Sequence, residues 1–251
     1  MSIARIVDKH LVWPLRKHYH KLHNLFATNS FAVRFYDDHL IRAFRSDQPT
    51  VSDISDHLPT IFSEIVAAFP KLIVELGTRG GESTKTILAA AKHSDATVLS
   101  IDINDCSGVE IATDFKFSWH FVQADDIIFE NDAFQKWCIT HALEPRIDVL
   151  FIDTSHLYEH TRAEIQAWFP HLSPRATVIF HDTNLNRTSR TYNNGILNIG
   201  WDNQRGVIRA IEELLGKHLN EGEVFAGVAA EWLIHHYPNS FGLTVLKKLT
   251  R

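Results

Sequence analysis

The stretch of sequence that decides the fold is LIVELGTRGGES, at residues 72–83. Five residues with the character of a β-strand lead into a turn that contains three glycines, and a helical pattern follows. Glycine lets the backbone approach a ligand closely and adopt positive φ, and the start of a helix presents free N–H groups. This stretch therefore predicts a strand, a ligand-binding turn and a helix in succession.

Short apolar runs alternate with helical patterns through the rest of the chain. We predict strands at residues 72–76, 97–101, 119–122, 147–152, 177–180, 232–236 and 243–246, and helices at residues 52–69, 83–92, 133–141, 158–169 and 206–215. Such alternation is typical of a mostly parallel sheet with helices on both faces. The last two strands are too close together for a crossover helix, which favours a hairpin. The expected fold is therefore α/β: a Rossmann-like, doubly wound sheet of seven strands, mostly parallel, with a C-terminal antiparallel hairpin strand.

Composition limits the class of protein. A chain of 251 residues with 45% hydrophobic and 22% charged residues can form one α/β domain with a full core. The net charge of -5 argues against nucleic acid as a partner, because binding to the phosphate backbone needs a basic surface. Two cysteines do not suggest a disulfide framework, so we expect a cytoplasmic protein. The apolar runs are too short to cross a bilayer, so we expect no membrane partner.

An acidic residue follows the second predicted strand, about twenty residues after the glycine turn. Asp102 ends that strand, where a carboxylate can accept the hydrogen bonds of a ribose diol. Ligands of such sheets lie at the carboxyl ends of the strands, which is where both features fall. The alternative is a turn that only reverses the chain beside a solvated aspartate. The glycine spacing is not G-x-G-x-x-G, which disfavours a nicotinamide-dependent oxidoreductase.

These motifs resemble those of a known family. Residues 75–83 are similar to the first motif of class I S-adenosylmethionine (SAM)-dependent methyltransferases, closest to catechol and caffeoyl-CoA O-methyltransferases. FIDTSHLYEHTRAE at residues 151–164 and LSPRATVIFHDT at residues 172–183 resemble the branch of macrolide sugar O-methyltransferases and cephalosporin-hydroxylase-like proteins. The resemblance extends from residue 71 to the C-terminus. It implies an enzyme that moves a methyl group from SAM to a hydroxyl of a small molecule, such as a natural-product sugar or phenol.

The resemblance also implies which residues hold SAM. Asp102 would bind the ribose hydroxyls, and Asp125 or its neighbour Asp126 would lie near the adenine amino group. A solvated turn is the alternative for that pair. Ser83 is also well placed to cap the helix that it begins. The full set of implied cofactor-binding residues is Glu75, Gly77, Thr78, Gly81, Ser83, Asp102, Ile103, Asp125 and Asp126.

A divalent cation, most simply Mg²⁺, is expected beside the methyl donor in this branch. Asp153 and Asp182 follow neighbouring strands, so their carboxylates share one rim and offer the oxygen ligands of a hard cation. His181 completes the expected metal set, although relatives carry an acidic or amide residue there. Because imidazole is softer, Zn²⁺, Mn²⁺ or Fe²⁺ would also suit the site. The alternative is that the aspartates cap the helices that follow them.

His156 matches the general base of the family, and we expect His156 and Asp153 to be the catalytic residues. A neutral imidazole can take the proton of an acceptor hydroxyl. His160 and His181 compete for this role, and a cap or surface role is the alternative. The long polar segment at residues 184–205 is expected to be a substrate lid.

Two units are expected in the chain. Residues 1–70 are predicted to be a helical segment that forms a lid or a dimer face, and residues 71–251 the SAM-binding domain of a homo-oligomer. Two other functions stay open: a non-catalytic SAM-binding or interaction protein on the same fold, and an N- or C-methyltransferase, because a fold does not determine a reaction.

Overall fold

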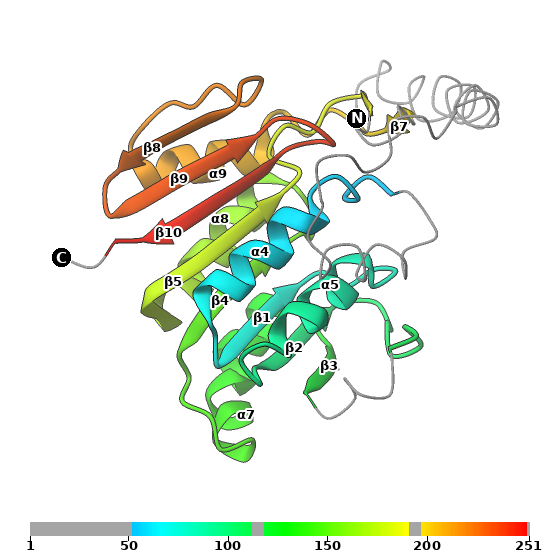
Figure 1. The fold of residues 1–251 in the computed structure, drawn as a ribbon, viewed down its shortest axis with the longest axis vertical. Helices are drawn as coiled ribbons and strands as arrows, with labels where there is room; N and C mark the ends of the chain where they lie inside the picture. The colour runs from blue at the N-terminus through cyan, green and yellow to red at the C-terminus, as the bar shows by residue number, and fades with distance from the viewer. Residues whose placement is uncertain (1–51, 112–117, 191–196, 250–251) are drawn as a thin grey trace.

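The structure is a computed structural model that describes residues 52–111, 118–190 and 197–249 (Figure 1). Most of the predicted N-terminal segment therefore lies outside the described residues. The elements are α4 (Leu58–Ala68), β1 (Leu72–Leu76), α5 (Glu82–Ala91), β2 (Thr97–Asp102), β3 (Trp119–Gln123), α6 (Asp126–Phe129), a π-helical turn (Glu130–Phe134), α7 (Gln135–Thr140), β4 (Ile147–Ile152), α8 (Tyr158–Trp168), a 3-10 turn (Phe169–His171), β5 (Leu172–His181), β6 (Thr188–Arg190), β7 (Leu197–Ile199), α9 (Gly206–Leu215), β8 (Phe225–Ala229), β9 (Trp232–Tyr237) and β10 (Leu243–Lys248).

One sheet organises the described residues, in the order β3-β2-β1-β4-β5-β10-β9-β8 (Figure 1). Strands β1 to β5 pair in parallel, and β10 lies antiparallel between β5 and β9. The predicted α/β class, the parallel pairing and the terminal hairpin are confirmed. The predicted count of seven strands is wrong, because the sheet has eight.

The missed strand is β8, which forms the edge of the sheet beside β9. Its sequence is FAGVA, and its residues alternate between intermediate and exposed. An edge strand that buries little needs no continuous apolar run, and a glycine inside it weakens the pattern further. The sequence signal that identified the central strands is therefore weak in this one.

Helices cover both faces of the sheet, as predicted, and each face has its own core. On one face, Ile61 of α4 and Ile87 of α5 pack with Ile73 and Val149. On the other face, α7, α8 and α9 pack against the alternate residues of the same strands, among them Val74 and Leu150. A strand buried on both sides is apolar at nearly every position, which explains why β1 and β4 could be predicted from the sequence.

Three of the predicted elements have bounds that agree with the structure, namely β1, β4 and α9. The predicted helix at residues 133–141 is longer in the structure, because it is the end of a run that begins with α6 and includes the π-helical turn. Strand β5 also begins earlier than predicted, at Leu172. Its first residues include Pro174 and Arg175, which are exposed and interrupt the apolar pattern.

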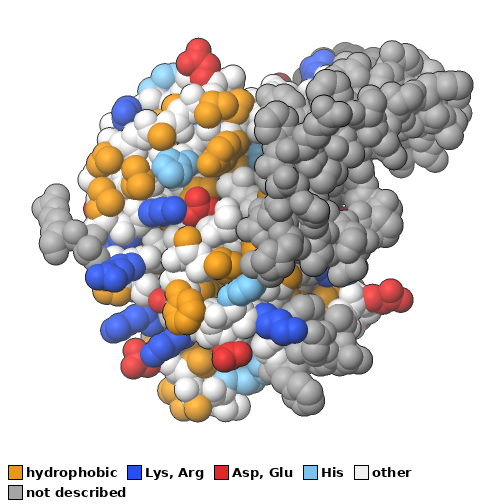
Figure 2. All heavy atoms as spheres, viewed as in Figure 1, with side chains coloured by type: hydrophobic (Ala, Val, Ile, Leu, Met, Phe, Trp, Pro, Cys, Tyr) orange, Lys and Arg blue, Asp and Glu red, His pale blue; other side chains and the backbone are white. Residues whose placement is uncertain are grey.

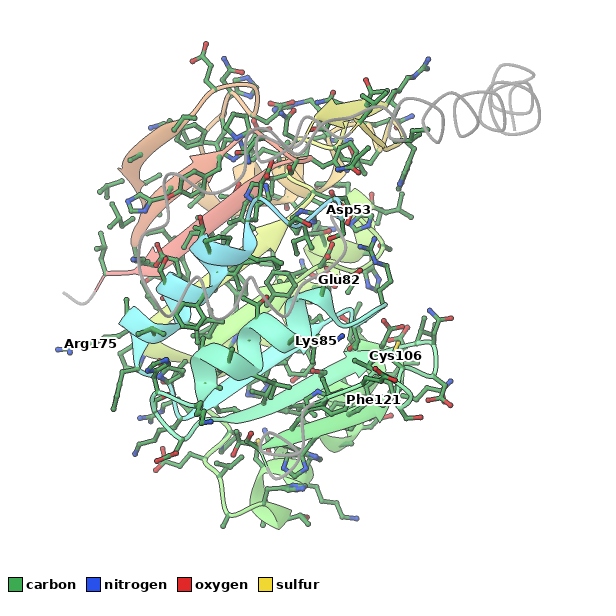
Figure 3. The ribbon with its side chains drawn as sticks, turned by 45° about the vertical axis from the view of Figure 1, so that its right-hand side comes forward. Asp53, Glu82, Lys85, Cys106, Phe121 and Arg175 are labelled. Atoms are coloured by element: carbon green, nitrogen blue, oxygen red, sulfur yellow. The ribbon has the colours of Figure 1, made fainter. Side chains whose placement is uncertain are left out.

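The carboxyl ends of β1, β2, β4 and β5 meet at one edge of the sheet. Figure 3 shows Asp53, Glu82 and Cys106 on this side of the molecule and Arg175 on the opposite side. In the space-filling view, Lys and Arg side chains gather on the left of the face that α4 covers, away from this edge (Figure 2). The topology thus brings most of the predicted site residues to one edge, which the next section describes.

Candidate active site

A cleft of about 350 Å³ opens at the carboxyl edge of the sheet, and ligand pockets of this size hold small molecules. It is lined by the glycine turn, by the residues that follow β2 and β4, and by the start of α6 and α8. The predicted residues among its lining are Gly77, Asp102, Ile103, Asp125, Asp126, Asp153 and His156. The other predicted residues, Glu75, Thr78, Gly81, Ser83, His181 and Asp182, lie behind or beside it.

The glycine turn packs tightly against the end of β4. Gly77 has a φ of 90°, and a Cβ added there would lie 2.1 Å from the carbonyl oxygen of Asp153. Only glycine permits that approach. Gly81, with a φ of 80°, is the N-cap of α5, and no side chain caps the helix. The prediction that Ser83 caps this helix is therefore wrong.

Ser83 instead belongs to a buried network around Glu75, which is 0% exposed. The Glu75 carboxylate accepts hydrogen bonds from the hydroxyls of Ser83 at 2.7 Å, Thr84 at 2.9 Å and Ser100 at 2.5 Å. Burial raises the pKa of Glu75 to about 7, although the three hydroxyls oppose the rise. The network joins β1, β2 and α5 beneath the turn, so Glu75 and Ser83 support the cleft from behind.

Asp102 holds the other side of the turn. Its Oδ2 accepts hydrogen bonds from the backbone N–H groups of Thr78 at 2.9 Å and Arg79 at 3.1 Å. Its Oδ1 accepts two from Asn104, from the backbone N–H at 2.8 Å and from the side-chain amide at 3.1 Å. Burial opposes ionisation, but the N–H groups of Asn104, Arg79 and Thr78 outweigh it and lower the pKa of Asp102. The side chain of Ile103, which is 68% exposed, offers an apolar surface beside this carboxylate.

The structure gives the two neighbouring aspartates different surroundings. Asp125 caps α6, because its Oδ1 accepts hydrogen bonds from the N–H groups of Ile127 and Ile128. Asp126 is buried and faces His160, with 3.3 Å between Oδ1 and Nε2. Both residues line the cleft, so which of them contacts a ligand stays a prediction.

Asp153, His181 and Asp182 form a cluster whose ligand atoms all lie within 4.8 Å of one another. Nδ1 of His181 lies 3.4 Å from Oδ1 of Asp153 and 3.4 Å from Oδ1 of Asp182. Both ring nitrogens of His181 and Oδ1 of Asp182 are buried and lack a partner with hydrogen-bond geometry. Two carboxylates and an imidazole that converge with unused lone pairs fit a divalent cation.

Charge holds this cluster together. Burial would lower the pKa of His181, but the charges of Asp182 and Asp153 raise it well above its ordinary value. Burial would raise the pKa of Asp153, but His181, His156 and Arg79 lower it. The carboxylates thus stay ionised, and a divalent cation that binds this cluster would displace the proton of His181.

His156 lies between the two aspartates. Its Nε2 is 3.2 Å from Oδ2 of Asp182, and its Nδ1 is 3.8 Å from Oδ1 of Asp153. His156 has a φ of 58° and Asp182 a φ of 57°, a conformation that costs energy in residues other than glycine. Asn203 donates a hydrogen bond to the carbonyl of His156 at 3.1 Å, and a Cβ on Gly206 would lie 2.4 Å from the same oxygen. The fold thus holds His156 in a strained position at the cleft.

The predicted lid begins next to this site. Residues 188–190 and 197–199 pair as the antiparallel strands β6 and β7, and residues 191–196 lie outside the described residues. After β7 the chain returns to His156, where the Trp201 ring lies 6.5 Å from the imidazole. The segment therefore borders His156, while its motion as a lid stays a prediction.

Several residues near the site were not identified from the sequence. Arg79 lines the cleft and forms a two-point ion pair with Asp53, at 2.7 Å and 3.0 Å. The His57 ring lies 5.6 Å from His181, and burial lowers the pKa of His57 to about 3, so it is neutral. Arg79 carried a signal, its place inside the glycine turn. Asp53 and His57 carried none, because only tertiary packing brings their segment to this edge.

Comparison with known proteins agrees with this geometry. Residues 74–183 match the family described as a methyltransferase domain. The chain is 30% identical over 162 residues to the uncharacterized protein y4gI of Sinorhizobium fredii; the match covers 61% of this chain and 18% of that protein. The chain thus spans less than a fifth of the length of this curated relative.

Solved structures share the fold. A candidate caffeoyl-CoA O-methyltransferase from Staphylococcus aureus has a TM-score of 0.52 at 16% identity, over 93% of this chain and 99% of that one. A methyltransferase from Geobacter sulfurreducens has a TM-score of 0.51 at 14% identity, over 85% of this chain and 90% of that one. At these identities the likeness concerns the fold.

The chain thus has the Rossmann-like fold that solved methyltransferases share, with a cleft at the carboxyl edge of its sheet. More particularly, residues 74–183, which are less than half of the chain, match the methyltransferase-domain family. They include the glycine turn, Asp102, the Asp153 cluster and His156. Among the described residues, no helix is both long enough and apolar enough to cross a membrane.

Proposed function

We propose that this protein transfers the methyl group of SAM to a hydroxyl of a small molecule, with the assistance of a divalent cation. One observation carries the proposal: the imidazole of His156, which can accept a proton, lies 3.2 Å from Asp182 on a strained backbone at the cleft. A histidine with no role beyond the surface would gain nothing from a strained backbone or from two neighbouring carboxylates.

The cofactor end of the cleft suits SAM. When bound, SAM supplies a methyl group on a positively charged sulfur. Asp102 keeps its charge and lines the cleft, where a ribose hydroxyl would replace the side-chain amide of Asn104 as a donor to Oδ1. The turn at Gly77 brings backbone close to the ligand, and the exposed Ile103 can pack against an adenine ring. No pyrophosphate site is required, which agrees with the glycine spacing.

The acceptor end suits a hydroxyl. His156 would take the acceptor proton, and the charges of Asp153 and Asp182 would stabilise the imidazolium that forms. A cation held by Asp153, His181 and Asp182 would lower the pKa of the hydroxyl and orient it. Trp201, which is 39% exposed, offers an aromatic face beside His156 for a sugar or phenol ring. Methyl transfer itself then depends mainly on alignment.

The first test is SAM binding by isothermal titration calorimetry. We expect micromolar binding by the wild-type chain and a loss of roughly 10- to 100-fold in Asp102→Ala, because hydrogen bonds to a charged group contribute about 1.5–3 kcal/mol. Asp105→Ala is the matched control, since Asp105 is an exposed acidic residue three positions along the same loop. Titrations with Mg²⁺ and after chelation show whether a cation contributes.

The outcomes separate the alternatives. Absence of SAM binding in every condition would contradict the proposal. Binding without methylation of any hydroxyl in a panel of sugars and phenols would favour a non-catalytic SAM-binding protein, and methylation of amines or carbon acids alone would indicate another chemistry. We also propose a cytoplasmic homo-oligomer, which size-exclusion chromatography with light scattering tests.

A further inference from the structure

A second group of possible metal ligands lies beneath the other end of the cleft. Asp126 begins α6, and His160 and Glu164 lie one turn apart on α8. Nε2 of His160 is 3.3 Å from Oδ1 of Asp126 and 3.5 Å from Oε1 of Glu164, and the three ligand atoms lie within 4.8 Å of one another. None of these residues belongs to the Asp153 cluster.

Each carboxylate of this group has one buried oxygen that no donor reaches. Glu164 is 0% exposed and Asp126 is 7% exposed. Thr154 donates a hydrogen bond to Oε1 of Glu164 at 2.6 Å, but Oε2 of Glu164 and Oδ2 of Asp126 have no hydrogen-bond partner. Buried carboxylates without donors are costly unless a cation offsets them.

The spacing suits a tetrahedral ion. Zn²⁺ binds nitrogen and carboxylate oxygen at about 2.0–2.2 Å, so the ligand atoms of a tetrahedral site are about 3.4 Å apart. The separations of 3.3 Å and 3.5 Å from His160 match this value. Asp126 and His160 also line the cleft, so an ion and a water as fourth ligand can enter from there.

We propose that Asp126, His160 and Glu164 form a second metal site, which takes Zn²⁺ or a similar divalent transition metal. Its mixed nitrogen and oxygen donors suit such an ion better than Mg²⁺, which prefers oxygen. The bound ion would link the start of α6 to α8 and thereby make that side of the cleft more rigid. It is a structural site, distinct from the cation of the proposed methyl transfer.

Zn²⁺ titration of the full chain tests this proposal, by calorimetry and by metal analysis after dialysis. We expect the wild-type chain to bind one Zn²⁺ more than His160→Ala. Glu164→Gln should weaken that binding at least tenfold, because it removes one charge while an amide oxygen can still accept the Thr154 hydrogen bond. Glu159→Gln is the matched control, since Glu159 is exposed on the same helix, and it should bind as the wild type does.

The double variant Asp153→Asn/Asp182→Asn separates the two sites. It should keep one Zn²⁺ per chain, and its melting temperature should rise with Zn²⁺ unless Glu164 is also replaced. The proposal is overturned if His160→Ala and Glu164→Gln bind Zn²⁺ as the wild type does. It is equally overturned if the folded double variant binds none. The double variant lacks two ligands of the Asp153 cluster, so metal lost from that cluster bears only on the proposed methyl transfer. The two proposals therefore fail separately.

Discussion

Glu75 and Asp153 are acidic residues of neighbouring strands, yet their surroundings are opposite. Glu75 is fully buried, and hydroxyls of Ser83, Thr84 and Ser100 donate to it. Asp153 reaches the cleft, and its nearest charged neighbours, His156 and His181, lie at 3.8 Å and 3.4 Å. The first carboxylate has its hydrogen bonds satisfied within the protein, whereas the second retains capacity to bind something else.

The difference in pKa shift has the same origin. Burial raises the pKa of Glu75 to about 7, because hydroxyl donors offset only part of the lost hydration. Burial acts on Asp153 too, but the charges of His181, His156 and Arg79 reverse it and lower the pKa. We infer that Glu75 maintains the fold under the glycine turn and that Asp153 serves chemistry. Variants of the two regions should therefore fail in different ways.

The largest effect is expected for Asp153→Ala. Loss of a cation ligand should reduce methyl transfer roughly 10³-fold, since a bound cation contributes several kcal/mol to the reaction. The melting temperature should fall by far less than turnover does, because in stability terms the variant loses only the interactions of Asp153 with its histidine neighbours. Turnover and melting temperature are the measurements. Asp148→Asn, at the opposite end of β4, is the control, and full activity in a folded Asp153→Ala would contradict the cation-assisted mechanism.

A smaller loss, roughly 10²-fold in kcat, is expected for His156→Ala, because general bases contribute about 10²–10⁴-fold. The KM for SAM should change less than kcat. Part of the lost rate should return at high pH, where the acceptor hydroxyl ionises without a base. A pH profile of kcat measures this, with the exposed His218→Ala as control. A variant with wild-type activity at every pH would remove His156 as the base.

The smallest effect is expected for Glu75→Gln, which should act on stability and its pH dependence. The folded pKa, about 7, exceeds the ordinary value of 4.5, so the folded state binds the proton more tightly. The stabilisation is therefore complete below pH 4.5 and is lost as the pH rises through 7. Glutamine, which does not titrate, should remove up to about 3 kcal/mol of this pH dependence.

Urea unfolding of Glu75→Gln and wild type between pH 4.5 and pH 8 measures that difference, with Glu159→Gln as the control. A difference in the free energy of unfolding that stays constant with pH would show that Glu75 is ionised in both states. Such a result would mean that Glu75 and Asp153 both carry a negative charge in the folded protein and differ only in their hydrogen-bond partners.

Much of the fold was predictable because its central strands are buried on both faces. Strands β1 and β4 are apolar at almost every position, and strands of this kind are conspicuous in a sequence. The edge strand β8 and the continuous helical run at residues 126–140 were missed or shortened, because their patterns depend on which side meets the core. The predicted N-cap of α5 was wrong for a local reason: Gly81 adopts positive φ and takes the N-cap position, and the Ser83 hydroxyl donates to Glu75 instead.

The residues of the site also fall into those that the sequence could predict and those that it could not. The turn, Asp102, Asp153 and His156 were identifiable because each follows a strand directly, and parallel strands bring their carboxyl ends to one edge. The Asp53–Arg79 ion pair and the placement of His57 behind His181 were not, since they join segments far apart in the chain. The three residues of the second metal site also needed α6 and α8 to be placed side by side.

The sequence by itself thus determined the parallel α/β sheet, its terminal hairpin, and the edge at which ligands bind, because hydrophobic periodicity and glycine placement are local properties of the chain. Only the tertiary structure decided which carboxylates are satisfied and which are free to bind a cation. That distinction depends on burial and on donors from distant elements, and neither is encoded in the neighbouring residues.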